Sequence, residues 1–262
     1  SINGYECTLS DALPRKIYKM NTLTILNKRI SFCPNIRTKS YQTITLFEAL
    51  NSIRTNVYDE QIKKIRRLLH NGSVQSYKSK KKQLPSYIFS GIAYGDRHKF
   101  DISGYTSLMV VDIDKLENPE LTKTQLKLDQ YVICVWTSPS GYGLKALFYL
   151  DYKTPINENI WILHEHCAFP QIDNYLLSKY GIHIDKAGAD IARLCFVSSD
   201  SEIHLKKDFQ PFPVYITLDK KQIWKLRTKY YYGNKSVRNA ILNEKRISKL
   251  TNNNISDFTA AH

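Results

Sequence analysis

The sequence has few cysteines, few acidic residues and no long apolar run, and each shortage excludes a class of protein. Its five cysteines are scattered and form no Cys-x-x-Cys pair, which argues against a zinc ribbon or a disulfide framework and favours a reducing cytosol. No apolar stretch approaches the roughly 20 residues that a membrane-spanning helix needs. No Gly-x-x-x-x-Gly-Lys-Ser/Thr motif occurs, so any ATP-driven motor lies elsewhere. We expect a cytoplasmic protein without a membrane segment.

The shortage of acid leaves a strong positive charge. Against 24 Asp and Glu stand 38 Lys and Arg, which gives a formal net charge of +14. Such an excess favours a polyanionic partner, most often a nucleic acid, and a generic basic surface is the alternative that charge alone leaves open. With 262 residues, the chain is long enough for one large domain or two modest ones.

The first third of the chain predicts a strand and two helices. Residues 22–33 alternate between apolar and polar as a strand does. Thr45 and Glu48 have the spacing of a capping box, which predicts a helix start, and a second helix follows Asp59. The basic run 77–82 is expected to be a loop, either solvated or in contact with phosphate.

Later elements are read from apolar runs and helical spacing. The expected order is a buried strand ending at residues 112–114, a helix over 118–129, a strand over 131–137, a tight turn over 138–143, a returning strand over 144–150, a long helix over 157–180 kinked or split at Pro170, and a strand over 194–197.

Two aspartates end the first buried strand. Asp112 and Asp114 are two residues apart, so on a strand both carboxylates point to the same side and repel each other. A divalent cation is the usual compensation, because hard cations take oxygen ligands. A plain polar turn is the alternative for an isolated Asp-x-Asp.

Two further blocks give this pair a chemical context. The turn between the later strands is rich in serine and glycine and is followed by a lysine, and a third block holds two aspartates and an arginine. The residues are Ser138, Ser140, Gly141, Gly143 and Lys145 in the first block and Asp185, Asp190 and Arg193 in the second. Three carboxylates can hold two metal ions, glycines let backbone N–H groups approach a triphosphate, and basic side chains bind phosphate. Together the blocks predict nucleotidyl transfer.

The blocks resemble the archaeo-eukaryotic primase superfamily (primase–polymerases), whose signature runs hhhDhD, then sxGxGxH, then a third aspartate. More closely, they resemble the BT4734-like family, also called the VirE N-terminal domain, which occurs in mobile elements and phages. The resemblance rests on residues 89–91, 110–114, 138–145 and 190–198 and covers roughly residues 21–215.

The resemblance implies an α/β (α+β) fold: an RRM-like primase palm with a mixed or antiparallel sheet flanked by helices, an α-helical N-terminal part and a basic C-terminal segment. It implies primer synthesis or extension from NTPs or dNTPs on a single-stranded DNA template with two Mg²⁺ or Mn²⁺ ions. Asp112 and Asp114 match the first metal ligands. Asp185 is the preferred third ligand, with Asp190 orienting Arg193 and serving as the alternative ligand. Lys145 departs from the superfamily's histidine, which puts priming, as opposed to extension, in question.

The resemblance also predicts the domain organisation. Residues 1–20 are an extension, natural or added, residues 21–215 form the catalytic domain, and residues 216–262 form a basic aromatic segment or a linker. Within that segment, lysines and arginines alternate with Trp224, Tyr230, Tyr231 and Tyr232, a mixture that suits single-stranded nucleic acid.

Two other functions are consistent with parts of the pattern. A catalytically degenerate domain would only bind single strands and recruit a helicase. A metal-dependent nuclease also uses clustered acids, although the Ser/Gly turn is better suited to a triphosphate.

Overall fold

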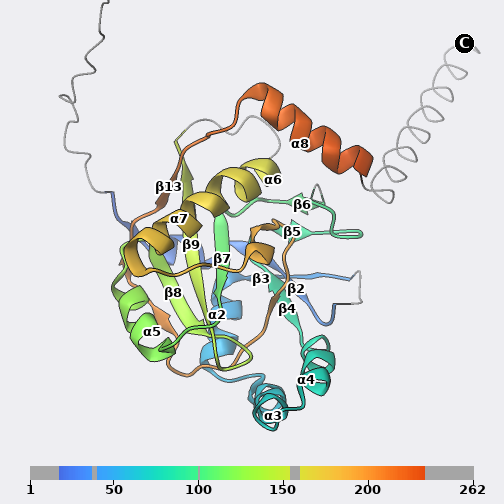
Figure 1. Cartoon of the computed structure of the whole chain (residues 1–262), viewed down its shortest axis with the longest axis vertical. Coiled ribbons are helices and arrows are strands. Elements are labelled where there is room, and N and C mark those ends of the chain that lie inside the picture. Colours follow the sequence, from blue (N-terminus) through green and yellow to red (C-terminus); the bar gives the residue numbers. More distant parts are fainter. Residues whose placement is uncertain (1–17, 37–39, 100, 154–159, 234–262) are drawn as a thin grey trace, which may run out of the picture.

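The computed structural model describes residues 18–36, 40–99, 101–153 and 160–233, which form an α+β fold of helices packed on antiparallel and mixed sheets, as expected (Figure 1). The helical elements are α1 (Leu23–Leu26), α2 (Leu46–Arg54), α3 (Asp59–His70), α4 (Val74–Lys81), α5 (Pro119–Leu128), α6 (Ile160–Leu163), the π-helical turn η1 (His164–Ala168), α7 (Phe169–Tyr180), the 3₁₀ turn η2 (Lys186–Ala189) and α8 (Lys220–Gly233). The strands are β1 (Met20–Asn21), β2 (Arg29–Cys33), β3 (Gln42–Thr45), β4 (Ser86–Ile88), β5 (Ile92–Ala93), β6 (Ile102–Ser103), β7 (Leu108–Ile113), β8 (Val132–Thr137), β9 (Leu144–Tyr152), β10 (Cys195–Phe196), β11 (His204–Leu205), β12 (Asp208–Phe209) and β13 (Phe212–Val214).

Strand β9 is the centre of the main sheet. It pairs antiparallel with β7 on one side and with β8 on the other, while β13 runs parallel to its last residues and β11 lies outside β8. The buried strands and the helix predicted from residue 108 to residue 150 are confirmed to within two residues. Their near-continuous apolar runs fit a sheet that is covered on both faces.

The two faces of the main sheet belong to two different cores. Successive residues of β7 point to opposite faces, so Val111 and Ile113 pack with α6, η1 and α7. Leu108 and Val110 instead join the core formed by α1, α2, α3 and strand β4. The alternation therefore turns Asp112 toward the N-terminal helices.

The N-terminal part combines helices with a second sheet, in the order β10–β4–β2–β3, all antiparallel. The predicted capping box opens α2: the Glu48 backbone N–H donates to Thr45 Oγ1, and the Thr45 N–H donates to the Glu48 carboxylate. Helix α3 begins at Asp59, as predicted.

Two sequence-based predictions in this part are corrected. The strand predicted over residues 22–33 is confirmed only for Arg29–Cys33, which is β2, whereas Leu23–Leu26 form the short helix α1, because the Asn21 side chain accepts from the Leu23 N–H and so favours a turn. The basic run 77–82 lies mostly in helix α4 instead of a loop. Lysine is a good helix former, and Tyr77 anchors the helix by its burial.

The long helix predicted over 157–180 is interrupted earlier than expected. The break is the π-helical turn η1, and Pro170 lies in the first turn of α7, where its missing N–H costs no hydrogen bond. Residues 157–159 lie outside the described part of the chain.

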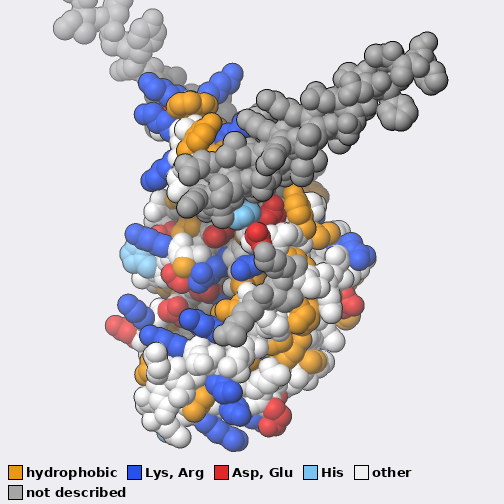
Figure 2. Space-filling view, turned by 90° about the vertical axis from the view of Figure 1, so that its right-hand side faces the viewer, with side chains coloured by type: hydrophobic (Ala, Val, Ile, Leu, Met, Phe, Trp, Pro, Cys, Tyr) orange, Lys and Arg blue, Asp and Glu red, His pale blue; other side chains and the backbone are white. Residues whose placement is uncertain are grey.

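The basic C-terminal segment begins as helix α8, which packs at one end of the molecule (Figure 1). Figure 2 shows Lys and Arg side chains at several places from the top to the bottom of this face, with acidic side chains among them. In the described ranges, no helix combines the length and the apolar content that crossing a membrane requires. The cysteines described there, Cys33, Cys134, Cys167 and Cys195, are free and buried.

A buried carboxylate ties the turn before β8 to helix α7. Asp129 is 1% exposed and accepts five hydrogen bonds. The donors are the backbone N–H groups of Tyr131 and Val132, the hydroxyls of Tyr175 and Tyr180, and the Lys179 ammonium. Burial opposes the charged form, but the hydrogen bonds outweigh it and hold the pKa of Asp129 below its usual value.

Asp129→Ala should therefore lower the free energy of unfolding by about 3 kcal/mol or more, since it leaves several buried donors unpaired. The depressed pKa adds a pH dependence: the carboxylate's contribution is fully present above its unfolded pKa of about 3.9 and is lost as the pH falls through the folded pKa. Urea unfolding at pH 7 and at decreasing pH measures both effects. Tyr180→Phe, which removes a single donor, is the milder control, and equal stability of wild type and Asp129→Ala would contradict this role.

Candidate active site

The candidate site lies where β7 ends, and its first element is an ion pair across the sheet. The antiparallel register places Asp112 directly opposite Lys145 on the same face. The Lys145 ammonium donates to Asp112 Oδ1, with side chains that are 7% and 24% exposed, respectively. Burial disfavours the charged lysine, but Asp112 outweighs burial and raises the pKa of Lys145. Lys145 is thus a cation at neutral pH.

Asp114, the second carboxylate, lies against the Ser/Gly turn. A Cβ added to Gly143 would stand 2.7 Å from Asp114 Oδ1 and 2.7 Å from the Ile113 carbonyl oxygen. Only glycine leaves room for this close approach. Lys115, directly after Asp114, has a positive φ of 58°, which bends the chain away from the strand.

The turn itself is held by backbone bonds and by an arginine from α3. The Ser138 N–H donates to the Gly143 carbonyl (2.8 Å), and Gly141 has a left-handed φ of 85° that favours glycine. Arg66 donates to the carbonyls of Ser138 and Pro139 at 3.2 and 3.4 Å. The turn is therefore rigidly placed beside the aspartates.

The two serine hydroxyls of the turn contact each other, with Ser138 Oγ 2.8 Å from Ser140 Oγ. At the base of the turn, the Ser198 hydroxyl donates to the Thr137 carbonyl, and the Thr137 N–H donates to Asp200 Oδ2. The segment after β10 thus supports the hairpin from its other side.

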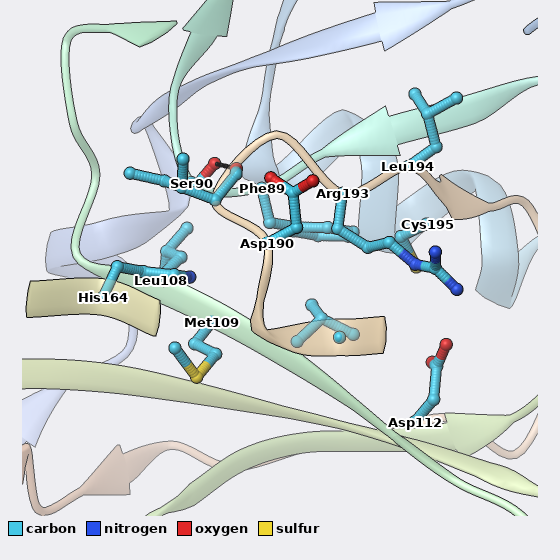
Figure 3. A pocket seen from close by; sticks show the side chains of 13 residues that line it. Phe89, Ser90, Leu108, Met109, Asp112, His164, Asp190, Arg193, Leu194 and Cys195 are labelled. Carbon is cyan, nitrogen blue, oxygen red and sulfur yellow. Dashed lines mark hydrogen bonds between the residues drawn. The ribbon is translucent and has the colours of Figure 1, made fainter. Parts of the chain in front are cut away.

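Asp185 and Arg193 join the site from the segment after α7. The Asp185 N–H donates to the Asp112 carbonyl at 2.9 Å, so the two residues are adjacent. Arg193 Nη2 lies 3.9 Å from Asp185 Oδ2. In Figure 3 the Arg193 guanidinium extends toward the end of the pocket that holds Asp112.

Asp190 lies apart from this group. Its carboxylate accepts from the Ala192 N–H at 2.8 Å, and its carbonyl accepts from the Arg193 N–H at 2.9 Å. Figure 3 shows it across the pocket from Asp112, and after burial, which is the main cause, its charge also raises the pKa of Glu165 in η1. Asp190 thus shapes the turn that presents Arg193, while Asp185 is the nearer of the two to Asp112.

Helix α4 supplies two residues that were not among the candidates from the sequence. Lys81 Nζ lies 5.8 Å from the Tyr77 ring centre and 5.7 Å from that of Phe196. Burial and then the neighbouring Lys145 lower the pKa of Lys81. Burial and then the charge of Asp114 raise the pKa of Tyr77. The basic run was the available signal, but only the helical register shows that Lys81 faces inward.

The site thus brings three cations, Lys81, Lys145 and Arg193, close to three carboxylates. Clustered cations repel one another, which favours binding of an anion. The carboxylates of Asp112, Asp114 and Asp185 offer the oxygen donors that Mg²⁺ and Mn²⁺ take. However, in the part of the chain that the structure describes, no three His, Cys, Asp or Glu side chains meet closely enough to hold a metal ion. The donors fit these ions in kind, while Lys145 competes for one oxygen of Asp112.

The site has open space beside it. A groove of about 690 Å³ runs between residues 114–118 and residues 180–185, so Asp114 and Asp185 stand at its wall. A second, small cavity of about 30 Å³ lies beneath Arg193 and has room for a water. The groove can admit a ligand next to the carboxylates.

Gly143→Ala should destabilise the fold and displace Asp114, because the new Cβ meets a backbone oxygen that cannot move cheaply. We expect a loss of about 2 kcal/mol, typical of an overpacked site. Urea unfolding measures it, with Gly233→Ala as control, since Gly233, like Gly143, has no positive φ but has open space around it. A smaller loss for Gly143→Ala than for the control would show that the turn adapts freely.

Comparison with known proteins agrees with part of the resemblance. Residues 79–204 match the family described as BT4734-like, N-terminal domain. The match includes every candidate site residue from Lys81 to Arg193 but not Tyr77, α3 or α8. No curated protein and no solved structure matches the chain. The relation to the wider primase superfamily stays a prediction, and residues 79–204 are similar to the BT4734-like N-terminal domain.

Proposed function

We propose that this chain is a primase–polymerase catalytic domain, which extends or starts a nucleic acid strand on a single-stranded DNA template with NTPs or dNTPs. The observation that carries the proposal is the meeting of Asp112, Asp114 and Asp185 with Lys145, Arg193 and Lys81 at one end of β7. Nucleotidyl transfer needs carboxylates that bind divalent cations and positively charged side chains that bind a triphosphate, both in the same place.

Asp112, Asp114 and Asp185 would hold two Mg²⁺ or Mn²⁺ ions. These ions would supply Lewis-acid activation of the attacking 3′ hydroxyl and neutralise charge on the leaving pyrophosphate. Asp185 is the preferred third ligand because its backbone N–H donates to the Asp112 carbonyl; the two carboxylates are otherwise alike, since Asp185 accepts from the Ala187 N–H and Asp190 from the Ala192 N–H.

The basic residues would bind the triphosphate. Lys145 and Lys81 act as point charges, and Arg193 offers a planar fork for two phosphate oxygens. The braced Ser/Gly turn would add hydroxyl donors from Ser138 and Ser140 without moving, because Arg66 already holds it. Positioning and charge neutralisation are thus the protein's contributions to the reaction.

A second candidate function is a single-strand-binding module that recruits a helicase without catalysis. The Lys145–Asp112 ion pair favours it, since a lysine can neutralise the aspartate in place of a cation. A primer-synthesis assay on single-stranded DNA with Mn²⁺ and labelled nucleotides separates the two functions. Products from the wild type but not from the Asp112→Asn variant support the polymerase, whereas strand binding without products supports the binding module.

Asp112→Asn and Asp114→Asn should each lower the synthesis rate about a thousandfold, corresponding to about 4 kcal/mol of lost transition-state stabilisation, while the fold is kept. Asp185→Asn should lower the synthesis rate by the same factor, and Asp190→Asn should lower it less. Steady-state rates with Mn²⁺ measure this order, and circular dichroism controls for folding. Full activity in both Asp112→Asn and Asp114→Asn would overturn the metal-site assignment, and a reversed order of Asp185 and Asp190 would reassign the third ligand.

Lys81→Ala and Lys145→Met should each weaken nucleotide binding about tenfold, the cost of one lost charge-assisted contact to phosphate. Lys80→Ala is the matched control, because Lys80 is on the same helix but exposed to solvent. Titration of a fluorescent nucleotide measures Kd for each variant. If Lys80→Ala weakened binding as much as Lys81→Ala, the effect would be one of general charge and not of this site.

A further inference from the structure

Helix α8 is attached to the domain through one apolar stripe. Ile223, Leu226 and Tyr230 recur at helical spacing and pack in the cluster that contains Trp161. The Trp161 and Tyr230 ring centres are 4.9 Å apart, and the Lys99 backbone N–H donates to the Tyr230 hydroxyl. The docking stripe fixes which side of α8 faces solvent.

The attachment is reinforced by a cation between the two rings. Lys99 Nζ lies 5.2 Å from the Trp161 ring centre and 5.3 Å from that of Tyr230, and it is ion-paired with Glu165. Helix α8 is therefore a fixed part of the surface.

A second stripe on α8 alternates charge and aromatic rings. Lys220, Trp224, Arg227 and Tyr231 stand at i, i+4, i+7 and i+11, so they follow one another along one side of the helix. Trp224 is 63% exposed, and the Arg227 guanidinium lies 5.6 Å from the Tyr231 ring centre. At 1.5 Å per residue the stripe is about 16 Å long.

The chemistry of this stripe selects its ligand. Helix α8 contains five Lys or Arg and no Asp or Glu, so its field favours a polyanion. An exposed indole held between basic side chains can stack on an unpaired base while the charges contact the phosphates on either side. A duplex also offers phosphates, but its bases are stacked on one another and leave no face for the indole. It would therefore contact only the basic side chains of the stripe.

We propose that the Lys220–Trp224–Arg227–Tyr231 stripe of α8 is a docking surface for single-stranded nucleic acid, on a helix that contributes no side chain to the groove beside Asp114 and Asp185. The inference rests on the proposed function for its ligand, the unpaired template strand. It adds a second point of attachment, which would hold the template while the active site works on its other end.

Trp224 itself provides the probe. Of the three tryptophans, Trp136 and Trp161 are 0% and 5% exposed. A ligand that binds the surface therefore quenches mainly the fluorescence of Trp224. An oligothymidine of about 16 nucleotides, the upper end of typical site sizes, should quench the emission of the full chain. Trp224→Ala should abolish the quenching and weaken Kd, measured by fluorescence anisotropy, about tenfold.

Two controls make the result specific. Tyr232→Ala removes an aromatic ring of similar exposure (71%) that is turned about 100° from Tyr231 around the helix, so it should leave Kd within about twofold. Affinity for a duplex of the same length should not change in Trp224→Ala. Unchanged single-strand affinity in Trp224→Ala, or equal losses for duplex and single strand, would overturn the proposal.

The test also separates this inference from the catalytic proposal. Asp112→Asn should lose synthesis yet retain quenching and single-strand affinity. Trp224-dependent binding by a wild type that makes no product would overturn the catalytic proposal alone. If the wild type makes product but Trp224→Ala binds single strands as tightly as the wild type does, only the α8 proposal is overturned.

Discussion

The register between β7 and β9 is the constraint on which the rest of the site depends. It places Asp112 opposite Lys145 and fixes both on the face that α3 and α4 approach. A slip of one residue would turn the whole row to the other face, into the apolar core of η1 and α7. The continuous apolar residues on that other face make such a slip costly, so packing far from the chemistry sets the position of the charged pair.

The loops of the site are held in place by partners from distant parts of the chain. Arg66 of α3 holds the Ser/Gly turn, and Asp200 and Ser198 bond the strand end beneath it. The backbone bond from Asp185 to Asp112 brings in the segment after α7. Four stretches far apart in sequence therefore converge, and the positions of the functional groups depend on the whole fold. This explains how a polar, mutually repulsive group of side chains can be kept in one place.

Charge is distributed differently at the end of β7 and on helix α8. At the β7 end, cations and carboxylates are interleaved, which suits a ligand that carries both phosphates and divalent cations. On helix α8 itself, basic and aromatic side chains occur without acids, which suits a strand of phosphates and bases. The charged side chains thus form two different surfaces, one with carboxylates at the end of β7 and one without them on α8.

The sequence by itself determined the local elements and the main candidates. Short-range signals are strong for the β7–β9 strands, for the capping box at Thr45 and for the Asp112–Asp114 pair, because apolar runs, caps and strand alternation act between near neighbours. It did not reveal that α1 is a helix, that Lys81 faces the site, or that Gly143 makes room for Asp114. Only the tertiary structure decided these, since each depends on contacts between segments whose separation in sequence carries no local signal.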